Sequence, residues 1–167
     1  VNCYRCPLGR TYPECGTACA DYLAYMIDHE NDIAAVIVEP VVGTNGVLVP
    51  PPEYLPRLAA LCKQHGILLI ADEVMTGYGR TGTVWGHQQF PMTPDVIVGG
   101  KGLGGGYVPM GAVAATDEVA EALRGSGFMY FTFTGNDASC AAALTVLDIL
   151  ERAPLVERAR MQGEVLG

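Results

Sequence analysis

Four short runs of apolar, mostly β-branched residues limit what this chain can fold into. They span residues 34–38, 67–71, 96–98 and 112–115. Each has the length of a strand and almost no polar residues, which is typical of strands that are buried on both faces of a sheet. Because helix-like patterns lie between or beside these runs, the sequence predicts an α/β protein with a mostly parallel sheet and flanking helices.

Helices are predicted in the segments that separate and follow these strands. Residues 17–30 precede the first strand, and a second helical segment opens at Pro51-Pro52 and ends at Gly66. Proline at the start of a helix and glycine just after its end are ordinary boundary signals. Two further helices are expected over residues 117–124 and around an apolar stripe within residues 140–150, and Pro154 should stop the last one.

Charge and hydropathy exclude two kinds of partner. The chain has 18 acidic and 10 basic residues, a formal net charge of −8, and its basic residues are scattered. Nucleic-acid binding needs clustered Lys and Arg, so no nucleic-acid partner is expected. No apolar stretch reaches the roughly 18 residues that a membrane span needs, so no membrane partner is expected either. The sequence therefore predicts a cytoplasmic protein.

Three of the predicted strands lead to an ionisable residue. Glu39 follows the first run, Asp72 follows the second, and Lys101 follows the third within residues 99–111, of which seven are glycine. Because the carboxyl ends of parallel strands meet at one edge of a sheet, where ligands bind, these three side chains should lie close together. Such a gathering indicates a functional site rather than three separate structural ion pairs.

A lysine and an acid at the same sheet edge suit one particular chemistry. An amine in a glycine-rich pocket can form a Schiff base with a carbonyl compound. A neighbouring carboxylate can keep a pyridinium nitrogen protonated, so that the ring acts as an electron sink. Lys101 and Asp72 therefore indicate pyridoxal 5′-phosphate (PLP) as a cofactor.

The chain contains VEPVVGTNGVLVPP, LLIADEVMTGYGRTG and PDVIVGGKGLGGGYVPMGA, followed by FTFTGN. These motifs resemble those of class III aminotransferases, which are fold-type I PLP-dependent enzymes. The resemblance covers nearly the whole chain. It implies that residues 1–153 are part of the PLP-binding large domain, and that residues 154–167 begin the connection towards a C-terminal small domain. Since family members are more than twice as long, we expect the natural protein to be longer than this chain.

The resemblance also implies roles for five residues. Lys101 matches the lysine of the Schiff base, Asp72 the acid that binds the pyridine nitrogen, and Val74 the apolar residue on one face of the ring. Thr132 matches a hydroxyl that binds the cofactor phosphate of the neighbouring subunit, which implies a homodimer. Glu39 matches an acid of the substrate region. No metal site is implied.

The remaining polar residues of the motifs are interpreted as structural. Strand alternation directs Glu73 away from Asp72. Arg80 is expected to support its loop through hydrogen bonds, and His87 is expected to pack in the interior. Met75 occupies a position where some family members carry a glutamine that hydrogen-bonds the ring oxygen of the cofactor, so no such contact is expected here.

The implied activity is that of a transaminase. It would move an amino group from an amine or ω-amino acid to a keto acid, pyruvate or 2-oxoglutarate, through the Schiff base on Lys101. One alternative is a catalytically incomplete fragment that is no enzyme by itself. Another is a dinucleotide-binding domain that uses Gly100, Gly102 and Gly105. That motif must open a helix, whereas the residues that follow here are of an extended type.

Four cysteines near the start of the chain have a spacing that invites a metal-site interpretation. Cys3, Cys6, Cys15 and Cys19 form a C-x2-C pair and a C-x3-C pair separated by eight residues. Such pairs occur in metal knuckles and redox motifs. The separation is shorter than in common zinc modules, however, and no histidine lies in the segment.

We predict that these four cysteines are reduced and bind no metal, as is usual for cytosolic proteins. Elemental analysis of the purified natural protein should find no stoichiometric zinc or iron. A stoichiometric metal that disappears in the Cys3→Ser variant would contradict the prediction.

Overall fold

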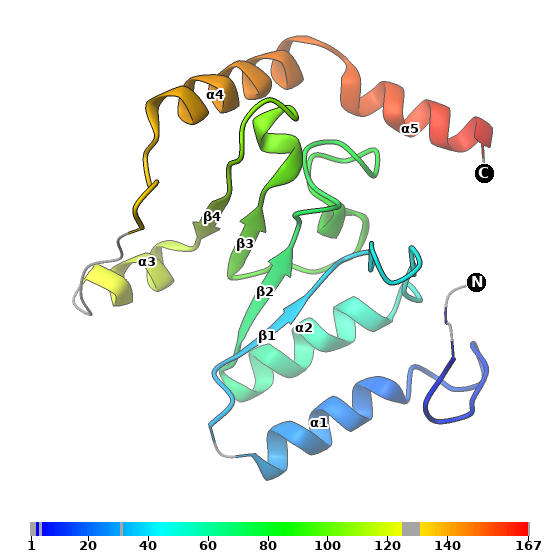
Figure 1. Cartoon of the computed structure of the whole chain (residues 1–167). Coiled ribbons are helices and arrows are strands. Elements are labelled where there is room, and N and C mark those ends of the chain that lie inside the picture. The colour runs from blue at the N-terminus through cyan, green and yellow to red at the C-terminus, as the bar shows by residue number, and fades with distance from the viewer. Residues whose placement is uncertain (1–2, 4, 31, 125–130, 167) are drawn as a thin grey trace.

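A computed structural model describes residues 3, 5–30, 32–124 and 131–166. In this part of the chain a four-stranded sheet has helices along one face and across one end (Figure 1). The strands are adjacent in the order β1, β2, β3 and β4, and their bounds are Ala35–Val38, Leu68–Asp72, Val96–Gly99 and Ala112–Ala115. Each bound lies within one residue of the predicted run.

The sheet is parallel except at one edge. β1 pairs with β2 and β2 with β3 in parallel, whereas β4 returns antiparallel to β3. In the register, Val38 lies beside Ala71 and Asp72 lies beside Val98. The three parallel strands therefore end close to the same level. The predicted α/β fold with a mostly parallel sheet is confirmed.

The hydrophobic core lies between one face of the sheet and two helices, α1 (Cys19–His29) and α2 (Tyr54–His65) (Figure 1). α2 ends as predicted at Gly66, whose φ of 67° is left-handed. Because side chains alternate along a strand, every second residue of β2 enters this core. The buried members of the core are Ala20, Ile27, Leu55, Leu58, Cys62, Ile67, Leu69, Ala71 and Met92.

The opposite face of the sheet is open in the described part of the chain. Ile37 of β1 is 61% exposed and Val113 of β4 is 68% exposed, and all four residues of β4 are exposed. The prediction that the strands are buried on both faces is therefore wrong for this part of the chain. The apolar sequence of a strand does not show which of its faces a helix covers, and α1 and α2 lie on the same face.

Three further helices follow the sheet: α3 (Asp117–Arg124), α4 (Asp137–Arg152) and α5 (Leu155–Leu166). The side chain of Asn136 caps α4 by accepting a hydrogen bond from the Ser139 N–H at 3.0 Å. α4 and α5 cross the end of the sheet at which the parallel strands terminate (Figure 1). They provide support for the loops at that edge. No described helix combines the length and the hydropathy needed to cross a membrane.

Candidate active site

Lys101 lies at the carboxyl edge of the sheet, two residues after β3. It begins the short 3-10 helix η2 (Lys101–Gly104) with a φ of 41°, which residues other than glycine rarely adopt. Such strained conformations cluster at functional sites, where the surrounding structure holds them. Nζ donates to Met75 Sδ at 2.7 Å. No ion pair among the described residues includes Lys101, so its amine has no carboxylate partner there.

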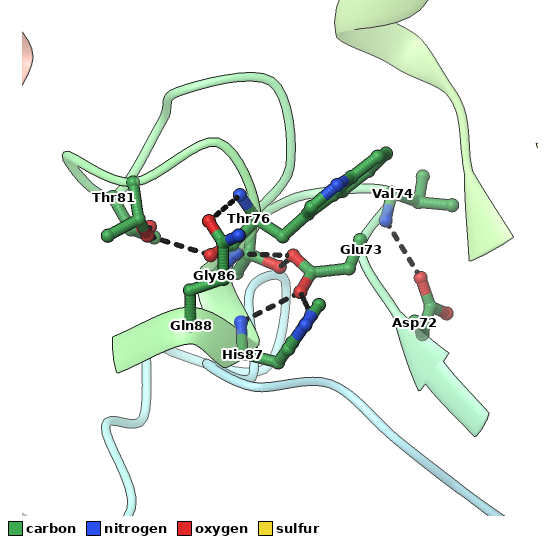
Figure 2. Close-up of polar contacts among 10 residues, drawn as sticks. Asp72, Glu73, Val74, Thr76, Thr81, Gly86, His87 and Gln88 are labelled. Atoms are coloured by element: carbon green, nitrogen blue, oxygen red, sulfur yellow. Dashed lines mark hydrogen bonds and ion pairs between the residues drawn. The ribbon is translucent and has the colours of Figure 1, made fainter. Parts of the chain in front are cut away.

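Asp72 is the last residue of β2, on the strand next to the one that leads to Lys101. Its Oδ1 accepts a hydrogen bond from the Val74 N–H at 3.0 Å (Figure 2). No hydrogen bond or ion pair within the described ranges involves Oδ2. One carboxylate oxygen is thus fixed by the backbone, and the other is available to a cationic group of a ligand.

Val74 follows the end of β2 and packs against the loop that carries Lys101. A β-carbon placed on Gly100 would lie 3.6 Å from both methyl carbons of Val74, which is ordinary van der Waals contact. The branched side chain therefore lies directly beside the residue that precedes Lys101. Asp72, Val74 and the loop that carries Lys101 therefore lie at the same edge of the sheet, and their role in a common site stays a prediction.

The loop after β1 reaches the same site through Met75. A β-carbon on Gly43 would lie only 2.9 Å from Met75 Cγ, so this close approach requires glycine. Glu39 Oε2 accepts a hydrogen bond from the Gly43 N–H at 2.9 Å and so fixes the start of this loop. Glu39 is thereby connected to Lys101 through Gly43 and Met75 rather than by direct contact.

Thr132 is the one proposed site residue that this chain does not bring to the others. It is exposed in the segment that leads to α4. None of the hydrogen bonds between described residues joins it to Asp72 or Lys101. A role in a neighbouring subunit is compatible with this position and stays a prediction.

Glu73, next to Asp72, is fully buried and points to the other side of the strand (Figure 2). Its carboxylate accepts four hydrogen bonds, and an ionised carboxylate has about four acceptor sites, so its capacity is filled. This confirms the structural interpretation of Glu73 and the interior position of His87. The four donors are Thr76 Oγ1 at 2.5 Å, Gly86 N at 2.8 Å, His87 N at 2.8 Å and His87 Nδ1 at 2.7 Å.

Tyr78 is a residue that the sequence interpretation missed. Its ring lies 5.0 Å from that of Trp85, and a β-carbon on Gly99 would lie 2.3 Å from its hydroxyl oxygen. It therefore fills the space between the loop after β2 and the end of β3. Burial raises the pKa of Tyr78, which keeps the hydroxyl neutral. A single aromatic residue between Gly77 and Gly79 is the signal that could have indicated this packing.

The described surface has two hollows near the sheet, and only the smaller one adjoins Lys101. The larger, of about 1290 Å³, lies between α2, α3 and the amino-terminal ends of β2 and β3. The smaller, of about 610 Å³, is lined by Arg80, Lys101 and the glycine-rich turn at residues 102–109. Because ligands of parallel sheets bind at the carboxyl ends of the strands, the smaller hollow is the relevant one.

The residues at this edge fit the cofactor that the sequence implies. Lys101 offers an amine without a counter-charge, Asp72 offers a free carboxylate oxygen, and Val74 offers an apolar side chain beside Gly100. These are the groups that an aldehyde, a pyridinium nitrogen and a ring face require.

The dinucleotide alternative does not fit the structure. The glycines at 100, 102 and 105 lead into the four-residue η2 and then into β4, which is antiparallel. A dinucleotide site needs the N-terminus of an α-helix at this point, to which the pyrophosphate binds.

A metal centre is also absent from the described ranges. Within them, no group of three or more His, Cys, Asp or Glu side chains could hold a metal ion, and the six cysteines are free. The prediction for Cys3, Cys6, Cys15 and Cys19 still depends on elemental analysis.

The known proteins that are similar to this chain all point to one family. A family model described as aminotransferase class-III matches residues 5–167. The chain is 46% identical over 137 residues to a putrescine aminotransferase from Pectobacterium atrosepticum, a match that covers 81% of this chain and 29% of that protein.

Two solved structures are similar over almost the whole chain. An (S)-enantioselective omega-transaminase from Thermomicrobium roseum has a TM-score of 0.89 at 45% identity, covering 98% of this chain and 38% of that one. An amine transaminase from an uncultivated Pseudomonas species, in its PLP-bound form, has a TM-score of 0.89 at 42% identity. This match covers 98% of this chain and 39% of that one. The chain thus spans only 29% to 39% of the length of these three proteins.

The filled carboxylate of Glu73 leads to a prediction about stability. Glu73→Gln keeps the shape of the side chain but turns an NH2 group towards N–H donors, so at least one buried donor loses its partner. In the full-length natural protein we expect the free energy of unfolding to fall by about 2–4 kcal/mol. Chemical denaturation measures this change.

The control for this experiment is Glu151→Gln, which makes the same chemical change at an exposed position of α4. It should alter the free energy of unfolding by no more than about 0.5 kcal/mol. Equal unfolding midpoints for Glu73→Gln and the unchanged protein would contradict the role assigned to Glu73.

Proposed function

We propose that this chain, which belongs to the class III aminotransferase family, holds the cofactor and the reacting lysine of a PLP-dependent transaminase. The family, together with the PLP-bound form of the Pseudomonas neighbour, implies the cofactor. The observation that carries the proposal is the placement of Lys101 and Asp72 at the ends of adjacent parallel strands. Because the chain spans only part of its relatives, the activity is proposed for the full-length natural protein.

Lys101 performs two tasks in the proposed reaction. PLP supplies an electron-withdrawing ring and, at C4′, a carbon that exchanges one amine for another. Lys101 Nζ would hold the cofactor through that carbon and would be displaced from it by the incoming amine. Once released, Nζ would serve as the base that moves the proton of the substrate carbon bearing the nitrogen. Its contact with Met75 keeps the amine at the sheet edge.

Asp72 and Val74 support the ring. Asp72, whose Oδ2 has no partner among the described residues, would hold the pyridine nitrogen of the cofactor, and its negative charge would keep that nitrogen protonated. The hydrogen bond from the Val74 N–H to Oδ1 fixes the orientation of the carboxylate. Val74 packs against one face of the ring, supported by its contact beside Gly100.

The neighbouring subunit contributes to the site in our proposal. Thr132 is exposed, and in a homodimer its hydroxyl would hold the cofactor phosphate of the second copy. Glu39 belongs to the substrate region, where it acts by fixing the loop that contacts Met75.

The amino donor that we propose is a primary amine or an ω-amino acid, and the acceptor is a keto acid such as pyruvate or 2-oxoglutarate. The names of the similar proteins support an amine donor, since they are a putrescine aminotransferase, an omega-transaminase and an amine transaminase. We further propose that the enzyme works in the cytoplasm, in keeping with free cysteines at all six positions.

The first test concerns the covalent bond. A bond from Lys101 Nζ to C4′ extends the conjugation of the cofactor ring, so the full-length protein should absorb visible light. Lys101→Ala should lose this absorption band and the transaminase activity together, because the amine serves both purposes. Borohydride reduction followed by peptide mapping should place the pyridoxyl group on Lys101.

Lys63, the other lysine of this chain, provides the matched control. Lys63→Ala should keep both the band and the activity. A pyridoxyl group mapped to Lys63 would show that Lys101 is not the attachment site.

The second test concerns Asp72. Asp72→Asn keeps the shape of the side chain but removes the charge that holds the ring nitrogen protonated. We expect the cofactor to remain bound at Lys101 while kcat falls by roughly 10²–10³, as the loss of an electrostatic stabilisation of a few kcal/mol gives. Asp148→Asn, at an exposed position of α4, should leave kcat unchanged. A kcat for Asp72→Asn within about twofold of the unchanged enzyme would contradict the role of Asp72.

A further inference from the structure

Among the described residues, the side chain of Lys101 has one hydrogen-bond partner, and that partner is a sulfur atom. Its Nζ donates to Met75 Sδ at 2.7 Å, and no ion pair between these residues includes Lys101. A thioether sulfur is only a weak acceptor. The position of the amine therefore depends on a bond that a chemical change at the sulfur would alter.

The hollow beside this amine contains no competing acid. Of the described residues, the charged ones that line it are Arg80 and Lys101 itself, and both are basic. The sequence suggested that Arg80 supports its own loop through hydrogen bonds, and this expectation is wrong in the described part of the chain, because no side-chain hydrogen bond or ion pair there includes it. A stronger acceptor at Met75 would thus meet no lining carboxylate that also binds Nζ.

The side chain of Met75 packs closely against the loop after β1. A β-carbon on Gly43 would lie 2.9 Å from Met75 Cγ and 3.1 Å from Cε. Glu39 holds that loop through its hydrogen bond with the Gly43 N–H. Because Sδ lies between Cγ and Cε, its side towards the loop is filled. An atom added to the sulfur therefore has room on the side that faces Nζ.

Met75 can also be reached from solution. It is 39% exposed, whereas Met92 in the core is 9% exposed. Met26 has the same exposed fraction as Met75, but it belongs to α1, which packs on the core face of the sheet (Figure 1). A small oxidant that reaches both sulfurs would change the surroundings of the reacting amine at Met75 but not at Met26.

We propose that Met75 is a site of reversible oxidation by hydroperoxides, and that its oxidation disables the neighbouring amine of Lys101. The sulfur donates an electron pair to one peroxide oxygen, so that an S–O bond forms and the O–O bond breaks. Hydrogen peroxide is thereby reduced to water, and the thioether is oxidised to a sulfoxide. The inference rests on the proposed function, because Lys101 is taken as the reacting amine.

The sulfoxide oxygen acts on Lys101 through its charge. It carries a partial negative charge and accepts hydrogen bonds far more strongly than the sulfur does, above all from a cationic donor. Nζ held by this oxygen is less free to attack the aldehyde carbon of the cofactor. The change is reversible, since a methionine sulfoxide reductase removes the oxygen as water while two thiols become a disulfide.

The test uses the full-length natural protein after its cofactor has been removed. Hydrogen peroxide is added and then destroyed with catalase, and dithiothreitol reverses the reversible oxidation of cysteines but not that of methionines. Peptide mass spectrometry should find one added oxygen on Met75. When PLP is then supplied, its visible band on Lys101 should form more slowly than in untreated protein by about tenfold or more. Sulfoxide reductases for both epimers should restore the rate.

Two variants separate Met75 from the other oxidised residues. Met75→Leu removes the sulfur but keeps an apolar side chain of similar volume. Compared with its own untreated sample, this variant should keep its rate of band formation after peroxide. Met26→Leu is the control with the same exposed fraction, and it should lose its rate as the unchanged protein does.

Three results would overturn the oxidation site. They are equal fractional losses of rate in Met75→Leu and in the unchanged protein, a normal rate in protein whose Met75 carries the oxygen, and a Met75 that stays unoxidised while Met26 is oxidised. The proposed function fails separately, if the untreated protein has no pyridoxyl group on Lys101. A pyridoxyl group on Lys101 together with any of the three results refutes only the oxidation site.

Discussion

The buried carboxylate of Glu73 holds together the part of the molecule on which the proposed chemistry depends. It accepts hydrogen bonds from two side chains and two backbone N–H groups, which come from the loop after β2 and from the 3-10 helix η1 (Gly86–Gln89). The backbone N–H of Glu73 also donates to Val98 O of β3 at 2.8 Å. Because Asp72 precedes Glu73 directly, this anchorage limits how far the Asp72 carboxylate can move.

The two charged groups of the proposed site, Asp72 and Lys101, are held in position by neighbouring strands and not by an ion pair with each other. Asp72 is fixed by β2 and by the Val74 N–H, whereas Lys101 is fixed by β3 and by a strained turn at its own backbone. Neither forms an ion pair with a described residue. An amine and a carboxylate are thus both left available for a ligand, at the cost of some backbone strain at Lys101.

The helices that cross the sheet edge give this region its rigidity. α4 packs on the glycine-rich turn, where a β-carbon on Gly105 would lie 3.0 Å from Val146 Cγ2, and α5 packs on the turn that carries Arg80. Loops so supported can carry binding groups with little loss of entropy on ligand binding. The acidic balance of the whole chain does not extend into the hollow beside Lys101, where the two charged lining residues, Arg80 and Lys101, are both basic.

The sequence by itself determined the strands, the site edge and the family, because apolar runs, strand-end residues and the DEVMTGYGRTG and GGKGL motifs are local signals. The opposite directions of Asp72 and Glu73 also followed from strand alternation alone. Only the tertiary structure decided which face of the sheet is covered, which four donors fill the Glu73 carboxylate, and that Arg80 has no partner in its own loop. These features depend mainly on how different segments pack against one another, and no periodicity or spacing within one segment encodes such contacts.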